Sequence, residues 1–247
     1  MNFDFTGKSV IITGASMGIG RACAIKFAEQ GANLALVDTD VDALGEVKAK
    51  LDGTNVKVLT YKCDISCEAE VKSVVESVIS ELGRVDVLVN NAGIWRNWTP
   101  FIETSSDMWK KYIDVNILGA MYFTQATLKS MLDNSYGRII NVASVAGVYG
   151  NANMAPYSMT KGALISFTKA LAKEVTASGI TVNAISPGSV SPTVDFDIDF
   201  VQDSELAFLG RTGSTAENAD LICFLASDNA AYISGQNIQI DGCRKRM

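Results

Sequence analysis

Three residues in the second half of the chain have types and spacing that could support proton transfer. Tyr157 and Lys161 lie four residues apart after Pro156, so on a helix that starts there both project from one face. Ser144 follows the apolar run IINVA, which places it at the carboxyl edge of a sheet, where ligands bind in α/β folds. A free tyrosine has a pKa of about 10, and a neighbouring ammonium lowers it. Because the sequence contains no histidine, proton transfer must use Tyr, Lys, Asp, Glu or Cys, and Tyr157 beside Lys161 is a candidate acid/base.

A glycine-rich turn near the start of the chain indicates a phosphate-binding site. The run SVIITGASMGIG places Gly14, Gly18 and Gly20 between an apolar strand and a helix. Glycines there let a pyrophosphate approach the backbone, and the helix N-terminus supplies N–H donors. Asp38 ends the next apolar run, where its carboxylate can bind the adenosine ribose and repel a 2′-phosphate, although it could instead cap the following helix. We therefore expect NAD(H) rather than NADP(H) as the cofactor.

The elements that must position these groups alternate along the whole chain. Short apolar runs predict strands at Ser9–Thr13, Asn33–Val37, Val56–Tyr61, Val85–Asn90, Arg138–Ala143, Thr181–Ile185 and Asn237–Ile240. Helical patterns lie between them at Ile19–Gln30, Val41–Leu51, Glu68–Leu82, Asp107–Leu132, Pro156–Ala177 and Ala216–Ala226. This alternation predicts an α/β Rossmann fold, a doubly wound parallel seven-stranded sheet with helices on both faces, in a single domain over residues 1–247. The irregular segment 189–213 is expected to form a substrate lid.

Composition excludes several classes of function. A net charge of −6 argues against nucleic acid and anionic membranes as partners. Five scattered cysteines and no histidine predict neither a disulfide framework nor a metal site. The N-terminal sequence lacks the positive charge of a signal peptide, and no run approaches the about 20 apolar residues of a membrane span. We therefore expect a cytoplasmic protein that acts on a small molecule.

Together these motifs closely resemble those of the classical short-chain dehydrogenase/reductase family, over essentially all 247 residues. The resemblance rests on the segments Thr13–Gly20, Cys63-Asp64-Ile65, Asn90-Asn91-Ala92-Gly93, Asn116, Ser144, Tyr157-x3-Lys161, Pro187-Gly188, FLASD at Phe224–Asp228 and SGQNIQIDG at Ser234–Gly242. It implies an NAD(H)-dependent oxidoreductase that interconverts a secondary alcohol and a ketone. It also implies a homotetramer, or less often a dimer.

The resemblance further implies a catalytic role for four residues. Tyr157 would exchange the proton with the substrate oxygen, and Ser144 would hold that oxygen. Lys161 would bind the nicotinamide ribose and lower the pKa of Tyr157. Asn116 would hold a water that links Lys161 to solvent, although from the residues alone it could simply cap or kink its helix.

The implied cofactor contacts extend along most of the chain. Asp64 would face the adenine, and Asn90, otherwise readable as a turn residue, would pack along the cofactor with Gly93. The full expected set is Gly14, Ser16, Met17, Gly18, Ile19, Gly20, Asp38, Asp64, Ile65, Asn90, Ala92, Gly93, Tyr157, Lys161, Pro187, Gly188, Val190 and Thr193. Thr193 stands one residue after the family's usual threonine position, which Pro192 occupies here.

The substrate pocket is expected to be rich in aromatic residues, although these could equally be core or interface residues. Its expected lining residues are Trp95, Trp98, Tyr149, Met154 and Phe196. Such a pocket suits a bulky apolar alcohol, and we expect a hydroxysteroid or bile-acid dehydrogenase.

Other classes of function remain open. A 3-oxoacyl-acyl-carrier-protein reductase usually carries basic residues where this chain has Asp133-Asn134-Ser135 and Thr176-Ala177-Ser178. A polyol or sugar dehydrogenase would need more polar groups to satisfy the substrate hydroxyls. An NAD-binding sensor or scaffold is the non-enzymatic alternative, but such proteins usually lose the catalytic Ser, Tyr or Lys, and all three are present here.

Overall fold

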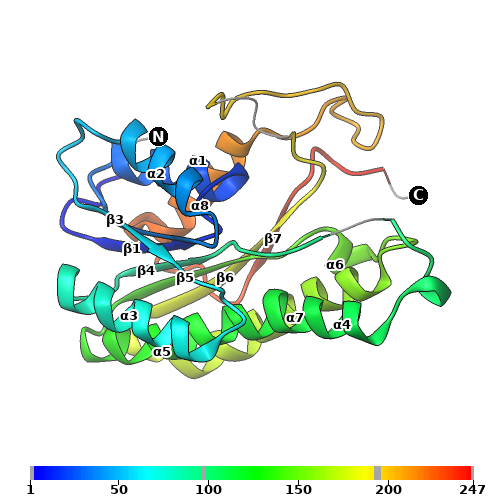
Figure 1. Cartoon of the computed structure of the whole chain (residues 1–247). Coiled ribbons are helices and arrows are strands. Elements are labelled where there is room, and N and C mark those ends of the chain that lie inside the picture. The colour runs from blue at the N-terminus through cyan, green and yellow to red at the C-terminus, as the bar shows by residue number, and fades with distance from the viewer. Residues whose placement is uncertain (1–2, 96–97, 192–195, 246–247) are drawn as a thin grey trace.

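The computed structural model describes residues 3–95, 98–191 and 196–245, which form one seven-stranded parallel sheet (Figure 1). The strands are β1 (Ser9–Thr13), β2 (Asn33–Asp38), β3 (Val58–Lys62), β4 (Val87–Asn90), β5 (Gly137–Val142), β6 (Ile180–Pro187) and β7 (Asn237–Ile240). Their order in the sheet is β3-β2-β1-β4-β5-β6-β7. The predicted doubly wound α/β fold is thereby confirmed.

Helices cover both faces of the sheet, as Figure 1 shows. On one face lie α1 (Gly18–Glu29), α2 (Val41–Lys50) and α8 (Thr215–Ala226), and on the other lie α3 (Glu68–Leu82), α4 (Ser106–Ile113), α5 (Gly119–Asp133) and α7 (Ala155–Val175). Each helix layer buries its own apolar cluster against the sheet, the first around Phe27 and Leu36 and the second around Phe123 and Val75. Strands covered on both sides must be apolar throughout, which explains their continuous hydrophobic runs.

The order of the strands fixes where a ligand can bind. The chain runs outward from β1 to β2 and β3, then returns to place β4 on the other side of β1, with Val10 paired to Leu34 and to Val87. The connections that leave β1 and β4 therefore diverge, and a crevice opens at their carboxyl ends. The glycine turn after β1 and the Asn90–Gly93 segment after β4 meet at this crevice.

The helix predicted over Asp107–Leu132 is interrupted in the structure. Helix α4 ends at Ile113, the backbone is π-helical over Asp114–Leu118, and α5 starts at Gly119. The apolar periodicity of the sequence continues through this point, so it does not reveal the change. Such π-helical turns are frequent at functional sites, and this one contains Asn116.

The segment after β6 pairs with the end of the chain. Phe208 N donates to Cys243 O at 2.9 Å, and Lys245 N donates to Leu206 O at 2.9 Å, so the two run antiparallel where they meet. In Figure 1 they lie together beyond the carboxyl edge of the sheet. None of the described helices is both long and apolar enough to cross a membrane.

Candidate active site

The glycine turn is tied directly to the end of β4. The Asn91 side chain donates through Nδ2 to Thr13 O at 2.9 Å and to Gly14 O at 3.0 Å. In return, Thr13 Oγ1 accepts from the backbone N–H groups of Asn91 and Ala92, each at 3.0 Å. Asn91 was not among the expected site residues, although it stands inside the Asn90–Gly93 motif. It fixes the turn relative to the neighbouring strand.

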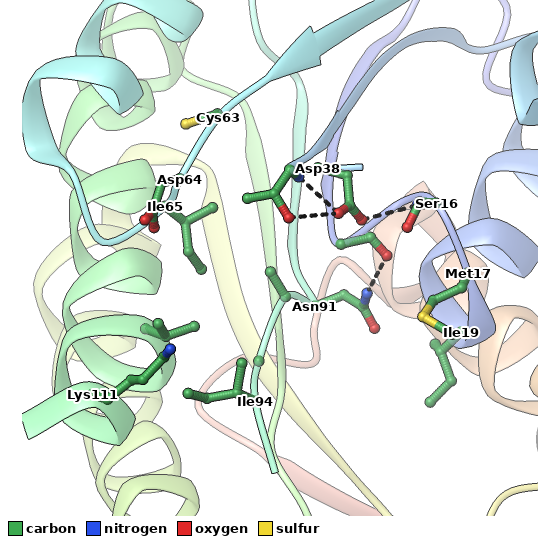
Figure 2. A pocket seen from close by; sticks show the side chains of 15 residues that line it. Ser16, Met17, Ile19, Asp38, Cys63, Asp64, Ile65, Asn91, Ile94 and Lys111 are labelled. Carbon is green, nitrogen blue, oxygen red and sulfur yellow. Dashed lines mark hydrogen bonds between the residues drawn. The ribbon is translucent and has the colours of Figure 1, made fainter. Parts of the chain in front are cut away.

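The turn and its surroundings line a cavity of about 500 Å³ at the carboxyl edge of the sheet (Figure 2). Nine of the expected cofactor residues line it, namely Gly14, Ser16, Met17, Ile19, Asp38, Asp64, Ile65, Ala92 and Gly93. Lys111, which the sequence did not single out, extends from α4 on the side opposite Met17 and Ile19. The cavity is therefore bounded by β1, β2 and β4 on one side and by α4 on the other.

Asp38 is held at one end of this cavity by backbone donors (Figure 2). Its Oδ2 accepts from Ser16 N at 3.1 Å. Its Oδ1 accepts from Thr39 N at 2.7 Å and from Asp40 N at 3.2 Å. Asp38 does not cap the following helix: the N-cap of α2 is Asp40, whose side chain accepts from Ala43 N. Asp38 thus presents a fixed carboxylate to whatever occupies the cavity.

The glycine turn has the features that a dinucleotide phosphate requires. Gly14 and Gly18 have φ values of +64° and +55°, which favour glycine. A Cβ at Gly18 would meet no atom within 4 Å, so the backbone there faces open space. Helix α1 has no side-chain cap at Met17 and no acidic residue in its first turn, which leaves its positive end available to an anion. A nicotinamide dinucleotide fits this donor set.

Gly20 has a different function from the other two glycines. A Cβ at this position would lie 2.0 Å from Gly14 O, so glycine is needed for α1 to pack against the turn.

A second cavity, of about 200 Å³, adjoins the first and is lined by three of the four candidate catalytic residues, Ser144, Tyr157 and Lys161. The two cavities share Ile19, Asn91, Gly93 and Ile94. The second is also lined by Trp95, Val142, Ala143, Ser144, Tyr157, Lys161, Pro187 and Gly188. The structure thus brings Ser144 after β5 together with Tyr157 and Lys161 on α7, next to the cavity that fits the dinucleotide.

The pKa of Tyr157 is raised in the structure, whereas the sequence led us to expect that Lys161 lowers it. Burial raises the pKa of Tyr157, a hydrogen bond with Ser144 lowers it, and electrostatic interaction with Tyr112 raises it, with burial the largest effect. Lys161 Nζ donates instead to Val142 O at 2.7 Å and lies 5.8 Å from the centre of the Tyr157 ring. Burial lowers the pKa of Lys161 itself to about 8. The shift in the pKa of Tyr157 thus comes from its burial, Ser144 and Tyr112, and not from Lys161.

The side chain of Asn116 is engaged by protein groups in this structure. Its Oδ1 accepts from Ile94 N at 2.7 Å, and its Nδ2 donates to Ile94 O at 2.9 Å and to Thr160 Oγ1 at 3.2 Å. A Cβ on Gly93 would lie 3.2 Å from both Asn116 Oδ1 and Lys161 Nζ. Asn116 therefore fixes the cavity wall beside Lys161, and Gly93 leaves space between them.

Two expected cofactor residues, Asn90 and Val190, lie elsewhere. The buried Asn90 amide donates to Thr124 Oγ1 at 3.1 Å and Asn141 Oδ1 at 2.9 Å, which ties β4 to α5 and β5. Val190 pairs with Gly213 in an isolated bridge. Thr193 and the neighbouring Pro192 lie outside the described residues.

The expected substrate-pocket residues fall into two groups. Trp95 and Trp98 pack edge to face with ring centres 6.0 Å apart, both half-exposed, and Met154 is buried beside Tyr157. The half-exposed Tyr149 bonds through its hydroxyl to the Gln239 side chain. Phe196 packs elsewhere in the described structure.

Phe196 belongs to the opposite helix layer. Its ring lies 4.5 Å from the Arg21 guanidinium on α1 and 5.8 Å from Lys50 Nζ on α2, and it packs on the apolar cluster of that layer. The guanidinium over the ring holds Phe196 there. The segment around Phe196 is irregular, so its sequence has no periodicity from which the helix layer that Phe196 packs on could be predicted.

Comparisons with known proteins agree with this geometry. A family model described as short chain dehydrogenase matches residues 8–199. The chain is 38% identical to the 3-oxoacyl-acyl-carrier-protein reductase FabG of Thermotoga maritima, over 96% of this chain and 97% of that protein. It is 35% identical to a 2-dehydro-3-deoxy-L-rhamnonate dehydrogenase (NAD(+)) of a Sphingomonas species, over 97% and 96% of the two chains.

A solved structure is similar over almost the whole fold. The crystal structure of an NAD+-bound xylitol dehydrogenase superposes with a TM-score of 0.89 at 33% identity, covering 96% of this chain and 99% of that one. Sequence, fold and the arrangement of the crevice lead to the same conclusion. The chain belongs to the short-chain dehydrogenase family and is an oxidoreductase that acts on CH–OH groups with a nicotinamide cofactor.

Proposed function

We propose that this chain is an NAD(H)-linked enzyme that interconverts a secondary alcohol and a ketone, with Tyr157 as the acid/base. The observation that carries the proposal is that Ser144, Tyr157 and Lys161 line one cavity, which adjoins the cavity lined by the glycine turn. Both hydroxyl groups can contact one substrate oxygen. Lys161 lies in the same cavity, where its ammonium can reach a ribose.

The chain's residues account for the proton in both directions. In ketone reduction, the Tyr157 phenol donates its proton to the oxygen as the hydride reaches the carbon, and Ser144 holds that oxygen in place. In alcohol oxidation, the Tyr157 phenolate takes the hydroxyl proton. When bound, the nicotinamide supplies the hydride acceptor or donor. Asn116 and Gly93 shape the wall beside Lys161, which is itself buried.

The position of Asp38 supports NAD(H) over NADP(H). A fixed carboxylate at the end of the cavity can accept hydrogen bonds from ribose hydroxyls and repels a phosphate in the same place. Two of the similar proteins carry NAD in their names. The 3-oxoacyl reductases match this chain at comparable identity, and their names specify no cofactor.

For the substrate, we favour a bulky apolar secondary alcohol such as a hydroxysteroid or bile acid. The half-exposed Trp95–Trp98 pair and the buried Met154 give the space around Tyr157 an apolar rim. The names of the relatives favour a second class of substrate, a 3-oxoacyl thioester or a sugar acid or polyol. In the described structure, Asp133 forms an ion pair with Lys129, which reduces the positive charge available to an acidic carrier protein.

The decisive experiment measures NAD(H)-dependent absorbance with hydroxysteroids, bile acids, polyols and 3-hydroxyacyl thioesters. We expect turnover of the first two classes, and Tyr157→Phe should lower kcat by about 100-fold or more without loss of NADH binding. Tyr122→Phe on α5 is the matched control. Activity confined to polyols or thioesters would replace the substrate class, whereas NADH binding with no turnover of any class would favour a sensor or scaffold.

We also propose a homotetramer and a single domain with the segment 189–213 as its lid. Met121 and Leu132 on α5 and Met159 on α7 are apolar and exposed in the single chain, which supports burial against another subunit. Light scattering after size exclusion measures the assembly.

A further inference from the structure

Tyr112 is a buried phenol beside the half-buried candidate catalytic tyrosine, Tyr157. It is 4% exposed and lies on α4 directly after Lys111, which lines the dinucleotide-sized cavity. The last turn of α4 therefore faces two spaces, one with Lys111 and one with Tyr112. Electrostatic interaction with Tyr112 also raises the pKa of Tyr157, which indicates that the two phenols are close.

The space between the two phenols is very small. A cavity of about 10 Å³ is lined by Tyr112 and Tyr157 together with Trp95, Thr99, Thr104, Met108, Asn153, Met154 and Pro156. It shares Trp95 and Tyr157 with the cavity of about 200 Å³ that contains Ser144 and Lys161. A volume of this size holds about one water molecule, which is close to the size of a methyl group.

The Tyr112 side of this space is held by several fixed contacts. Ser105 caps α4 through Met108 N, and Trp109 Nε1 donates to Thr104 Oγ1 at 2.7 Å. The Trp109 ring stacks on Phe101 with ring centres 5.3 Å apart and planes within 7°. Tyr112 therefore stands on a helix that is anchored at its start and is followed by the Asn116 contacts, so the wall cannot easily retreat.

Tyr157, the group taken to contact the substrate oxygen, also lines this small cavity, so the reacting carbon would lie near it. If Ser144 and Tyr157 hold the substrate oxygen, the carbon carries two substituents close to the Tyr157 ring. One can extend through the larger cavity toward the half-exposed Trp95 and Trp98. The other is directed toward Tyr112, where the remaining space is about one methyl group.

We propose that Tyr112 is a specificity-determining residue that limits one substituent on the reacting carbon to about the size of a methyl or a single ring methylene. The proposal rests on the proposed function, because it takes Tyr157 and Ser144 as the groups that hold the substrate oxygen. It predicts a preference for methyl ketones, or for a carbonyl on a terminal ring, over a carbonyl flanked by two large groups.

The test compares 2-heptanone with 4-heptanone, isomers that differ in the smaller substituent on the carbonyl carbon. With NADH, we expect the wild-type kcat/KM to be at least about tenfold higher for 2-heptanone, which is the discrimination that extra methylenes produce in a closed pocket. Tyr112→Ala should raise activity on 4-heptanone and remove most of this ratio. Tyr112→Phe keeps the ring and should therefore keep the wild-type ratio of kcat/KM for 2-heptanone to that for 4-heptanone.

Two further variants separate an opened pocket from a damaged protein. Met154→Ala widens the same cavity from the start of α7 and should also reduce the ratio, even if Tyr112→Ala does not fold. Tyr122→Ala removes the same side chain from a partly buried position on α5 and should leave the ratio unchanged.

The outcomes distinguish this proposal from the proposed function. A wild-type ratio near one, or a ratio that survives both Met154→Ala and a folded Tyr112→Ala, would overturn the role of Tyr112 while the enzyme remains active. A wild type that binds NADH, measured by its fluorescence, and reduces neither heptanone would overturn the proposed activity on apolar ketones, and this inference with it.

Discussion

Asn116 and Ile94 are joined by a two-way hydrogen bond. The amide of Asn116, in the π-helical turn between α4 and α5, accepts from Ile94 N at 2.7 Å and donates to Ile94 O at 2.9 Å. The Asn116 side chain thus bonds both the N–H and the C=O of Ile94, as a neighbouring strand would, in the segment that follows β4. Because Ile94 lines both cavities, this one contact positions the dinucleotide space and the candidate catalytic space relative to each other.

Asn116→Ala should destabilise the protein and impair activity. The change leaves the two Ile94 backbone groups without their partner, which costs about 1–3 kcal/mol for each group that is left unsatisfied. Urea unfolding measures the loss. Asn134→Ala is the control, because the Asn134 amide caps α5 on the surface, where water can replace its bond to Ser130 O. Equal stability of the two variants would contradict the role given to Asn116.

The two positive-φ glycines of the turn should respond differently to alanine. At Gly18, alanine adds only left-handed strain of about 1–2 kcal/mol, but its methyl group enters the open space that fits the phosphates. At Gly14, a Cβ would also lie 2.9 Å from Ala92 Cα and from Asn91 Nδ2. We therefore expect Gly18→Ala to weaken NADH binding with little loss of folding stability. Gly14→Ala should lose both NADH binding and folding stability.

Thermal unfolding with and without NADH separates the two effects. Tight NADH binding by Gly18→Ala would argue against phosphate contact at this turn.

Asp38→Asn should shift the cofactor preference toward NADP(H). The amide keeps one oxygen, which can still accept from Thr39 N and Asp40 N, but it loses the acceptor for Ser16 N and the charge that repels a 2′-phosphate. At about 4 Å and an effective dielectric constant of about 20, that repulsion is about 4 kcal/mol, and solvent reduces it. We expect the ratio of kcat/KM for NADP+ to that for NAD+ to rise about tenfold or more.

Asp42 is an exposed carboxylate on the following helix, α2. Asp42→Asn should leave the ratio of kcat/KM for NADP+ to that for NAD+ unchanged. An unchanged ratio in Asp38→Asn would show that another group selects the cofactor.

The pH dependence of activity should follow the raised pKa of Tyr157. Because burial raises this pKa, the phenol prevails at neutral pH, which favours ketone reduction, and alcohol oxidation should speed up as the pH rises into the alkaline range. Ser144→Ala removes a hydrogen bond that lowers the pKa, so the rise should move to higher pH.

Profiles of kcat/KM against pH for alcohol oxidation measure the shift. Ser77→Ala on the surface of α3, whose hydroxyl donates only to Ser73 O among the described contacts, should reproduce the wild-type profile. A profile for Ser144→Ala that moves to lower pH would contradict the Ser144–Tyr157 contact.

The sequence by itself determined the alternation of elements, the family and the phosphate-binding turn. Apolar runs and helical periodicity are short-range patterns, and a glycine with positive φ is a property of its own backbone, so both can be derived without knowing which strands are neighbours. For the same reason, the sequence could place Tyr157 and Lys161 on one face of a helix and Ser144 at the end of a strand.

Only the tertiary structure decided what surrounds these residues. The contacts of Asn91 with Thr13, of Asn116 with Ile94 and of Tyr112 with the Tyr157 cavity join segments that the strand order brings together. The direction of the Tyr157 pKa was also decided there, because desolvation depends on every neighbour, whereas the spacing to Lys161 reveals a single charge. Phe196 packed on Arg21 instead of near Tyr157 because the irregular segment around it follows no local periodicity.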